Sequence, residues 1–361
     1  MLWCLSGCKH DPVLISEEPS QITLCWNKAY ETESIDQVML GLNWTLATVG
    51  AKYKTSFKIN QENRILLSIG ELGFSSNAKK QFERLHEKLK TTEEYQQWGA
   101  VDVGRYVTLI LGASEHYYAI NEIPKTLPEI LNKYQLESES GYVSNSGISS
   151  HHRVISFSKQ VGLRQFFLSR EIDKVSGEIL EYETIEIMEN GHLKFGIYDA
   201  DSSRLNASKP LFSRAGKPAK CMWCHESKIV PAFNVQKDVT GYLPYLQFKD
   251  KLTQFDMELK EKQLQHKSGI DFSKKQDHVQ MELLYISFMN PSAMRLANEW
   301  GMSEDAVLSK LQGQTSVSNT EFPFLGLLYN RNDIRHLAPY MGAEVSTSVR
   351  EFSINEVNYI E

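Results

Sequence analysis

The sequence predicts an α+β protein in which a helical region, an antiparallel β-meander and a second, mainly helical region follow one another. Three observations predict this order. Apolar residues recur at helical spacing between about residues 31 and 135, the period changes to two across residues 151–205, and helical spacing returns beyond about residue 231. With 361 residues, 41% of them hydrophobic and 11% aromatic, the chain can bury one large core or two to three smaller ones. We therefore expect a globular protein.

The first eight residues end in the run Leu5-Ser6-Gly7-Cys8, which resembles the end of a bacterial lipoprotein signal. Leu5-Ser6-Gly7-Cys8 matches the lipobox, in which small residues precede a cysteine that is lipidated and becomes the mature N-terminus. Residues 1–7 are apolar, but they are shorter than a secretory signal and lack its basic segment, so residues 1–8 are interpreted as a truncated lipoprotein signal. The resemblance implies that Cys8 is the lipid anchor, and a frayed apolar N-terminus is the alternative. The polar, proline-containing residues 9–30 are typical of a tether.

Residues 31–135 are predicted to form a helical domain. Ser76-Asn77 is expected to cap a charged helix whose apolar residues recur at helical spacing. A second helix is expected from about Asp102 to Ile120, and it carries His116 on its apolar face. Such a histidine is usually a hydrogen-bonded core residue, although its imidazole could also reach a metal centre in another domain.

The next stretch is predicted to change from linker to sheet. Residues 136–150, rich in Glu, Ser and Gly, are expected to form a linker or exposed loop, and residues 151–205 an antiparallel β region. The expected strands are Arg153–Ser158, Arg164–Arg170, Ile179–Met188 and His192–Tyr198. Ser176-Gly177 and Asn190-Gly191 between them are turn dipeptides. The period of two predicts a meander with one buried face.

Within residues 206–314 lies the most informative run of the chain, Cys221-Met222-Trp223-Cys224-His225. This C-x-x-C-H pattern is the attachment signature of a c-type haem. Two thiols that add to the vinyl groups on one porphyrin edge must lie about one helical turn apart, as i and i+3 do, and the next residue then offers an imidazole to the iron. From the counts of 5 Cys and 10 His, a chance match is expected roughly 0.002 times.

Two other chemistries use the same residue types. A thioredoxin-like dithiol usually opens a helix within a βαβ pattern, and no such pattern surrounds this run. A structural zinc site would need a second Cys or His pair, and the adjacent Cys224 and His225 chelate a tetrahedral ion poorly. Neither alternative explains the full motif as directly as haem attachment does.

On these five residues the chain resembles a monohaem c-type cytochrome. The resemblance implies one covalent haem c, held by thioethers to Cys221 and Cys224 with His225 as the proximal iron ligand. Small c-type cytochromes place a methionine some tens of residues further on as the second axial ligand, and Met289 is the candidate because it lies at a helix junction beside Asn290-Pro291. Met281, Met294, His278 and His116 are weaker candidates. The large flanking regions have no counterpart in small cytochromes, so a ligand from another region, or none, is the alternative.

The C-terminal part of the chain is predicted to be mainly helical. A stripe of Phe248, Leu252, Phe255 and Leu259 predicts a packed helix. Further helices are expected over His278–Met289, over Ser292–Trp300 with Asn290-Pro291 as N-cap and first residue, and after Ser303. Residues 315–361 show no clear period and form an unassigned C-terminal tail.

Charge and cysteine usage limit the partners. A net charge of −6 with scattered Lys and Arg excludes a basic stripe, so we expect no nucleic acid partner. The longest apolar run, Val107–Ala113, is too short to cross a bilayer. If Cys8 carries lipid and Cys221 and Cys224 carry haem, only Cys25 remains in the mature chain, which leaves no intramolecular disulfide. Cys25 is then most simply a small buried hydrophobic residue.

The sequence therefore predicts a haem c-binding lipoprotein of the bacterial cell envelope, facing the periplasm. Its expected function is electron transfer through one haem, with a redox partner protein or a small-molecule oxidant or reductant, and with the membrane reached through the lipid anchor. Two alternatives are a haem enzyme or a gas or peroxide sensor with an open distal site, and a structural lipoprotein stabilised by haem. No other catalytic motif is recognised.

Overall fold

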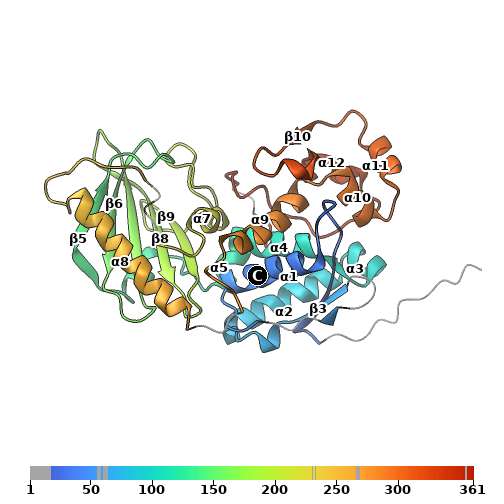
Figure 1. The fold of residues 1–361 in the computed structure, drawn as a ribbon, viewed down its shortest axis with the longest axis horizontal. Helices are drawn as coiled ribbons and strands as arrows, with labels where there is room; N and C mark the ends of the chain where they lie inside the picture. Colours follow the sequence, from blue (N-terminus) through green and yellow to red (C-terminus); the bar gives the residue numbers. More distant parts are fainter. Residues whose placement is uncertain are drawn as a thin grey trace, which may run out of the picture.

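The computed structural model describes residues 18–54, 58–59, 64–229, 231, 233–265, 269–353 and 356–361. Cys8 and the expected signal segment lie outside the described residues. Helices combine with a five-stranded antiparallel sheet, which confirms the predicted α+β class. In Figure 1 this sheet and helix α8 form one side of the molecule, and the remaining long helices form the other. No helix in the described ranges is long and apolar enough to span a membrane.

The first 135 residues contain a small sheet besides the expected helices. Its strands are β1 (Gln21–Cys25), β2 (Lys58–Ile59), β3 (Arg64–Ser68) and β4 (Val101–Asp102), in the order β2-β3-β1-β4. Strands β1 and β3 pair antiparallel, and every second residue of each is buried. The expectation of a purely helical region missed this sheet because strands of two to five residues are too short to produce a strong alternation beside long helices.

This region contains six helices among the described residues. They are α1 (Ile35–Thr48), α2 (Ser76–Lys90), α3 (Glu93–Trp98), α4 (Val103–Leu111), α5 (Ser114–Ile120) and α6 (Leu127–Leu131), with a 3-10 turn at Ile69–Glu71. The two predicted stretches correspond to α2 and to α4 with α5. The cap of α2 is Ser75, whose side chain accepts from Ala78 N, rather than Ser76-Asn77. The helix expected over Asp102–Ile120 is two helices, because the chain changes direction between Gly112 and Ala113, whose backbone is extended.

The meander predicted for residues 151–205 is confirmed and gains a strand. The strands are β5 (Leu136–Val143), β6 (His152–Ser158), β7 (Phe166–Ile172), β8 (Ile179–Ile187) and β9 (Leu193–Asp199), in sequential antiparallel order. Much of the expected linker over residues 136–150 is therefore strand β5, an edge strand. An edge strand borders solvent, so the charged and serine-rich sequence of β5 resembles that of a loop. Charged side chains on such a strand also limit its pairing with other chains.

Two layers cover the two faces of the five-stranded sheet. The register places Ile155, Ser169 and Glu183 side by side on one face, and α7 (Pro218–His225) and α8 (Tyr245–Gln263) pack against it. Phe255 of α8, for example, contacts the rings of Phe157 and Phe167 at 5.5 and 5.7 Å. The four apolar residues of the predicted α8 stripe are all buried. The opposite face is covered in part by the segment that contains α6, where Tyr134 stacks on Phe166.

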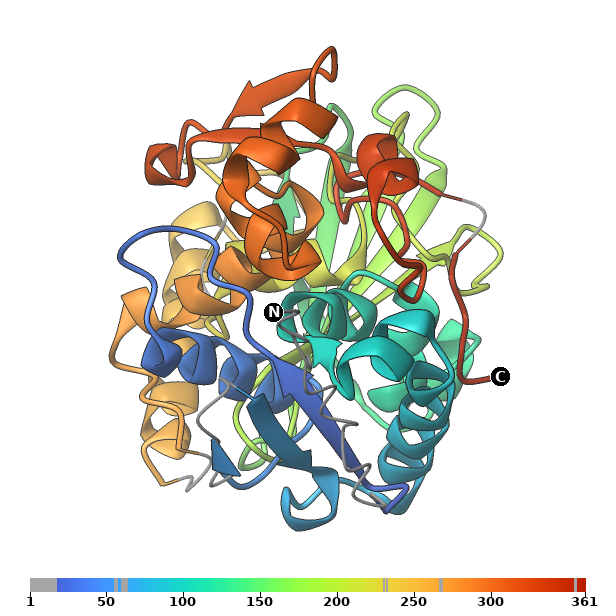
Figure 2. The ribbon, with the colours of Figure 1, turned by 90° about the vertical axis from the view of Figure 1, so that its right-hand side faces the viewer.

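The C-terminal third packs mainly on the N-terminal helices. It contains α9 (Lys275–Met289), α10 (Ala293–Trp300), α11 (Glu304–Lys310), β10 (Ser316–Ser318), β11 (Leu327–Tyr329), α12 (Arg331–Ile334) and 3-10 turns at Pro323–Leu325 and Arg335–Leu337. The N-cap of α10 is Ser292, which accepts from Arg295 N, so the Asn290-Pro291 pair expected to open this helix lies just before it. Figure 2 shows the last residues running along the N-terminal helices, where Arg84 donates to the carbonyl of Ile360.

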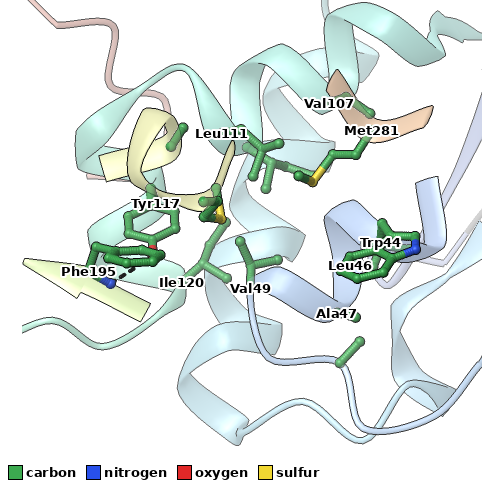
Figure 3. Close-up of a cluster of buried hydrophobic side chains, with 14 of the residues drawn as sticks. Trp44, Leu46, Ala47, Val49, Val107, Leu111, Tyr117, Ile120, Phe195 and Met281 are labelled. Atoms are coloured by element: carbon green, nitrogen blue, oxygen red, sulfur yellow. Dashed lines mark hydrogen bonds between the residues drawn. The ribbon is translucent and has the colours of Figure 1, made fainter. Parts of the chain in front are cut away.

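One apolar core joins the sheet side to the helical side. Figure 3 shows part of it, with Trp44 and Val49 from the end of α1, Met281 from α9 and Tyr117 from α5. The Tyr117 hydroxyl accepts a 3.0 Å hydrogen bond from the backbone N–H of Phe195 in β9. The core continues to Phe157 and Phe248 under the large sheet, so α5 and α7 lie at the junction of the two sides.

Candidate functional site

Helix α7, which carries the C-x-x-C-H run, is anchored at its start by a buried lysine. Lys217 occupies the N-cap position, and its Nζ lies 2.7 Å from Oε1 of Glu356 and 2.9 Å from the carbonyl oxygen of Thr347. Both ion-pair partners are almost fully buried. The backbone N–H of Lys217 also donates to the carbonyl of Val349. The C-terminal segment therefore fixes where α7 begins, and Pro218 follows at the first helical position, where a missing N–H costs nothing.

The two sides of α7 face different surroundings. Met222 is buried in the core, and the ring of Trp223 lies 5.1 Å from that of Tyr285 in α9. Cys221, Cys224 and His225 all line a pocket between α7 and the large sheet. The i and i+3 spacing of the two cysteines thus places both in the wall of the same pocket, together with the histidine that follows them.

The pocket lies against the sheet face that α7 and α8 cover. It holds about 1080 Å³ of atom-free space, including the solvent at its mouth. Apolar side chains from three elements make most of its wall: Val143, Ile155, Phe167 and Ile185 of the sheet, Leu252 of α8, and Ile148, Ile229 and Phe233 of the connecting segments. An apolar wall interrupted by a few polar groups is typical of small-molecule and cofactor sites.

A small set of charged groups interrupts this apolar wall. Arg153 of β6 donates to both carboxylate oxygens of Glu183 at 2.9 and 3.1 Å and lies 2.8 Å from Oε2 of Glu171. Arg214 and Lys220 also line the pocket. The buried guanidinium of Arg153 is tolerable there because it contacts two carboxylates, those of Glu183 and Glu171.

The protonation states of the motif residues favour ligation over thiol redox chemistry. Burial lowers the pKa of His225, so its imidazole is neutral near pH 7 and keeps a nitrogen lone pair for a metal. Burial, with the nearby Glu183 carboxylate, raises the pKa of the Cys221 thiol. Redox-active dithiols need a lowered thiol pKa, so the environment of Cys221 is unlike a thioredoxin site. Cys221 and Cys224 are both free thiols.

Met289, the expected second axial ligand, lies away from this pocket. It is buried in the main core at the end of α9 and is not among the side chains that line the pocket. Helix α7 lies between, since its Trp223 contacts α9 while its cysteines line the pocket. The structure therefore does not bring Met289 together with His225.

The weaker ligand candidates also have other positions. Met281 lies in the core, where its sulfur accepts from Thr48 Oγ1, and Met294 packs in a separate small cluster. The ring of His278 lies 5.3 Å from Trp44. His116 accepts from Tyr359 N through Nε2, and its Nδ1 lies 2.8 Å from the carbonyl of Leu109, so both nitrogens are used. His116 is a hydrogen-bonded core histidine, the common case for such a position.

Several pocket residues were not identified from the sequence, namely Ser146, Arg153, Ser169 and Glu183. The alternation of side chains between the two faces of the predicted strands could have identified three of these residues. In the runs predicted as strands, the face that carries Ile155, Phe167 and Ile185 also carries Arg153, Ser169 and Glu183, which are unexpected on a buried face. The loop position of Ser146 has no comparable pattern.

Within the ranges that the structure describes, no three His, Cys, Asp or Glu side chains are gathered so that they could hold a metal ion. A haem makes a different demand, because the porphyrin supplies the equatorial nitrogens and the protein only the axial ligands.

No protein-family model, curated protein or solved structure matches this chain.

Proposed function

We propose that the chain binds one haem c in the pocket between α7 and the large sheet, with thioethers at Cys221 and Cys224 and with His225 on the iron. The observation that carries the proposal is that all three side chains of the motif line one large, mostly apolar pocket. Haem is a flat apolar ring with an ionic edge, and a mostly apolar lining with a few charged groups suits such a group.

The donor set of the pocket fits the proposal in a second respect. Nδ1 of His225 is buried and has no hydrogen-bond partner among the described residues. An unpaired buried polar atom is costly, and binding of a metal to the imidazole, with reorientation of the ring, would give both nitrogens a role. Phe195 packs against the imidazole with ring centres 5.7 Å apart and limits its motion.

A bound haem would supply redox and ligand-binding chemistry at its iron. The protein's own residues have more limited tasks. The buried ion pair of Lys217 with Glu356 positions α7, and through it the motif side chains. The apolar wall excludes water, and the Arg153–Glu183 pair provides hydrogen-bonding groups on the sheet side.

Between the two haem functions considered, the pocket lining favours an open axial position that accepts a small ligand. The sheet side of the pocket offers Ile155, Phe167, Ile185 and Ser169 together with the Arg153–Glu183 pair. Aliphatic and aromatic side chains, serine and a paired arginine are poor iron ligands, whereas electron carriers usually complete the iron with methionine or histidine. We therefore infer a haem enzyme or sensor for a small molecule, rather than a carrier ligated by Met289.

Ligand binding to the reduced protein tests this function. The chain would be matured in a host that attaches haem c, as wild type, as Met289→Leu and as His225→Ala. We expect fast, stoichiometric carbon monoxide binding by wild type and Met289→Leu, and an altered spectrum for His225→Ala. A sulfur-to-iron charge-transfer band in the oxidised wild type that disappears in Met289→Leu would contradict an open site.

Electron transfer is the second candidate, and one observation favours it. Cys224 is exposed, so the haem edge attached there would lie near the surface, where electrons pass to a redox partner protein or a small oxidant or reductant. Slow or absent carbon monoxide binding in both wild type and Met289→Leu would support this candidate with another axial ligand.

We also propose an envelope location, with the lipid anchor at Cys8. The support is the lipobox match, together with the attachment of haem c outside the bacterial cytoplasm. A Cys8→Ala variant with a complete upstream signal is expected to move from the membrane pellet to the soluble periplasmic fraction. Equal fractionation of the two forms would contradict the anchor.

A further inference from the structure

The pocket contains more hydrogen-bond donors than its own acceptors use. Nε of Arg153, Oγ of Ser146 and Oγ of Ser169 are buried atoms with no hydrogen-bond partner among the described residues. All three residues line the pocket. Buried polar groups in native structures almost always have partners, so three unpartnered groups in one pocket indicate that something bound there supplies them.

These groups are held in place by contacts that leave the unpartnered atoms unused. The two Nη groups of Arg153 bind Glu183, Glu171 and Ser213 Oγ, which fixes the guanidinium while Nε–H remains. Ser169 lies in the middle of the sheet, paired in register with Ile155 and Glu183. The loop before Ser146 is fixed by Gln236, whose Oε1 accepts from the N–H groups of Ser144 and Asn145.

The charge of the lining indicates the sign of the missing partner. Three cationic side chains line the pocket in the part of the chain that the structure describes, namely Arg153, Arg214 and Lys220. They face two carboxylates, Glu183 in the lining and Glu171 behind Arg153, which leaves one positive charge in excess. Excess positive charge in a partly closed pocket favours an anion.

We propose that the sheet side of this pocket binds an oxygen-bearing anion through Arg153, Ser146 and Ser169. This inference rests on the proposed haem function and deepens it by naming the chemistry of the ligand. Carboxylates and small oxyanions accept several hydrogen bonds at once, which suits three unpartnered donors in one pocket. The anion comes from one of two sources, a carboxylate of the haem itself or a separate small oxyanion that binds at the open axial position.

Single serine variants test the inference without disturbing the buried ion pairs. Ser169→Ala and Ser146→Ala each remove one donor, and Ser140→Ala is the matched control. Gly141, the next residue of strand β5, pairs with Ile155 on the face that carries the pocket and lies against Phe248 of α8. Ser140 therefore lies on the opposite face of the sheet, away from the pocket. Each haem-loaded variant would be titrated with nitrite in the oxidised form and with carbon monoxide in the reduced form, and its midpoint potential would be measured against pH.

The outcomes distinguish the two sources of the anion from each other and from the case in which the pocket binds no anion. A separate oxyanion predicts that nitrite binds about tenfold more weakly to Ser169→Ala and Ser146→Ala, with Ser140→Ala and all carbon monoxide affinities unchanged. A haem carboxylate predicts unchanged nitrite affinity but a shifted pH dependence of the midpoint potential in the same two variants. If neither quantity differs from the control while the intact mass shows haem, the inference is overturned and the haem proposal stands. A wild-type mass without haem overturns both.

Discussion

Two clusters of buried charges occur in this protein, and they differ in balance. On the helical side, Arg105, Arg295 and Arg331 meet Glu94, Asp102 and Glu299, three cations against three carboxylates. On the sheet side, Arg153 alone faces the carboxylates of Glu171 and Glu183, and Glu181 lies beside them on the same face. Arg105, Glu299 and Arg331 of the first cluster line a smaller cavity on the helical side, whereas the second cluster borders the proposed haem pocket.

The ratio of cations to carboxylates in each cluster influences the pKa values of its carboxyl groups. Burial alone would raise the pKa of Asp102 and of Glu299, but Arg295 and Arg331 more than offset it, and both values lie below the usual range. Glu94 is the exception, because burial outweighs Arg105 and raises its pKa. In the sheet cluster, burial raises the pKa of Glu171, and burial with the neighbouring Glu183 raises that of Glu181 to about 8.

The comparison teaches that buried charge can serve either stability or a site. The balanced cluster joins β4, α4, α10 and α12 through hydrogen bonds such as Arg331 Nε to the carbonyl of Phe288, and it holds these elements together. In the unbalanced cluster, Glu181 keeps its proton and Nε of Arg153 has no hydrogen-bond partner among the described residues, and the cluster lies next to a pocket. Perturbed titration beside a concave pocket is typical of functional sites.

The largest effect is expected from breaking the balanced cluster. Arg295→Met leaves Asp102 buried with its main partner removed, since Arg295 Nη2 lies 2.7 Å from Asp102 Oδ1. Such a loss costs about 3–5 kcal/mol in the free energy of unfolding, measurable by urea denaturation. Lys52→Met is the control, because the exposed Lys52–Glu189 pair contributes little, and equal destabilisation by the two variants would refute the assignment.

A smaller effect is expected from the corresponding change in the sheet cluster. Arg153→Met is expected to lower the free energy of unfolding by about 2–3 kcal/mol, less than Arg295→Met, because Glu183 is partly exposed and Glu171 can take up a proton. The same urea experiment measures it. A loss larger than that of Arg295→Met would show that the two clusters do not differ as described.

The third effect concerns pH, and per pH unit it is the smallest of the three. Between about pH 4.5 and 8, Glu181 is protonated in the folded state and ionised in the unfolded state, so the folded state binds more protons and stability falls as pH rises. The slope contributed is at most about 1.4 kcal/mol per pH unit. Glu181→Gln, which resembles the protonated form, should remove this contribution and lie close to wild type near pH 5. Parallel stability curves for the two proteins would contradict the raised pKa.

The sequence predicted what depends on local pattern and missed what depends on pairing between distant segments. The meander and the α8 stripe follow from side-chain period, and the haem motif from five adjacent residues. Strand β5 was missed because its exposed edge makes it resemble a loop, and β1 and β3 because they are short. Met289 was chosen from its position along the chain, but which side chains face His225 depends on how α7 lies between α9 and the sheet. That arrangement depends on the Lys217–Glu356 pair, whose partners are 139 positions apart by residue number (356 − 217).

The central claim is that Cys221 and Cys224 hold a haem covalently, and the intact mass of protein matured in a haem c-competent host tests it most directly. The account predicts the polypeptide mass plus one haem for wild type and for Cys25→Ser, a control thiol at the end of β1. The double variant Cys221→Ser, Cys224→Ser should have only its polypeptide mass. A wild-type mass equal to that of the bare polypeptide would contradict the account.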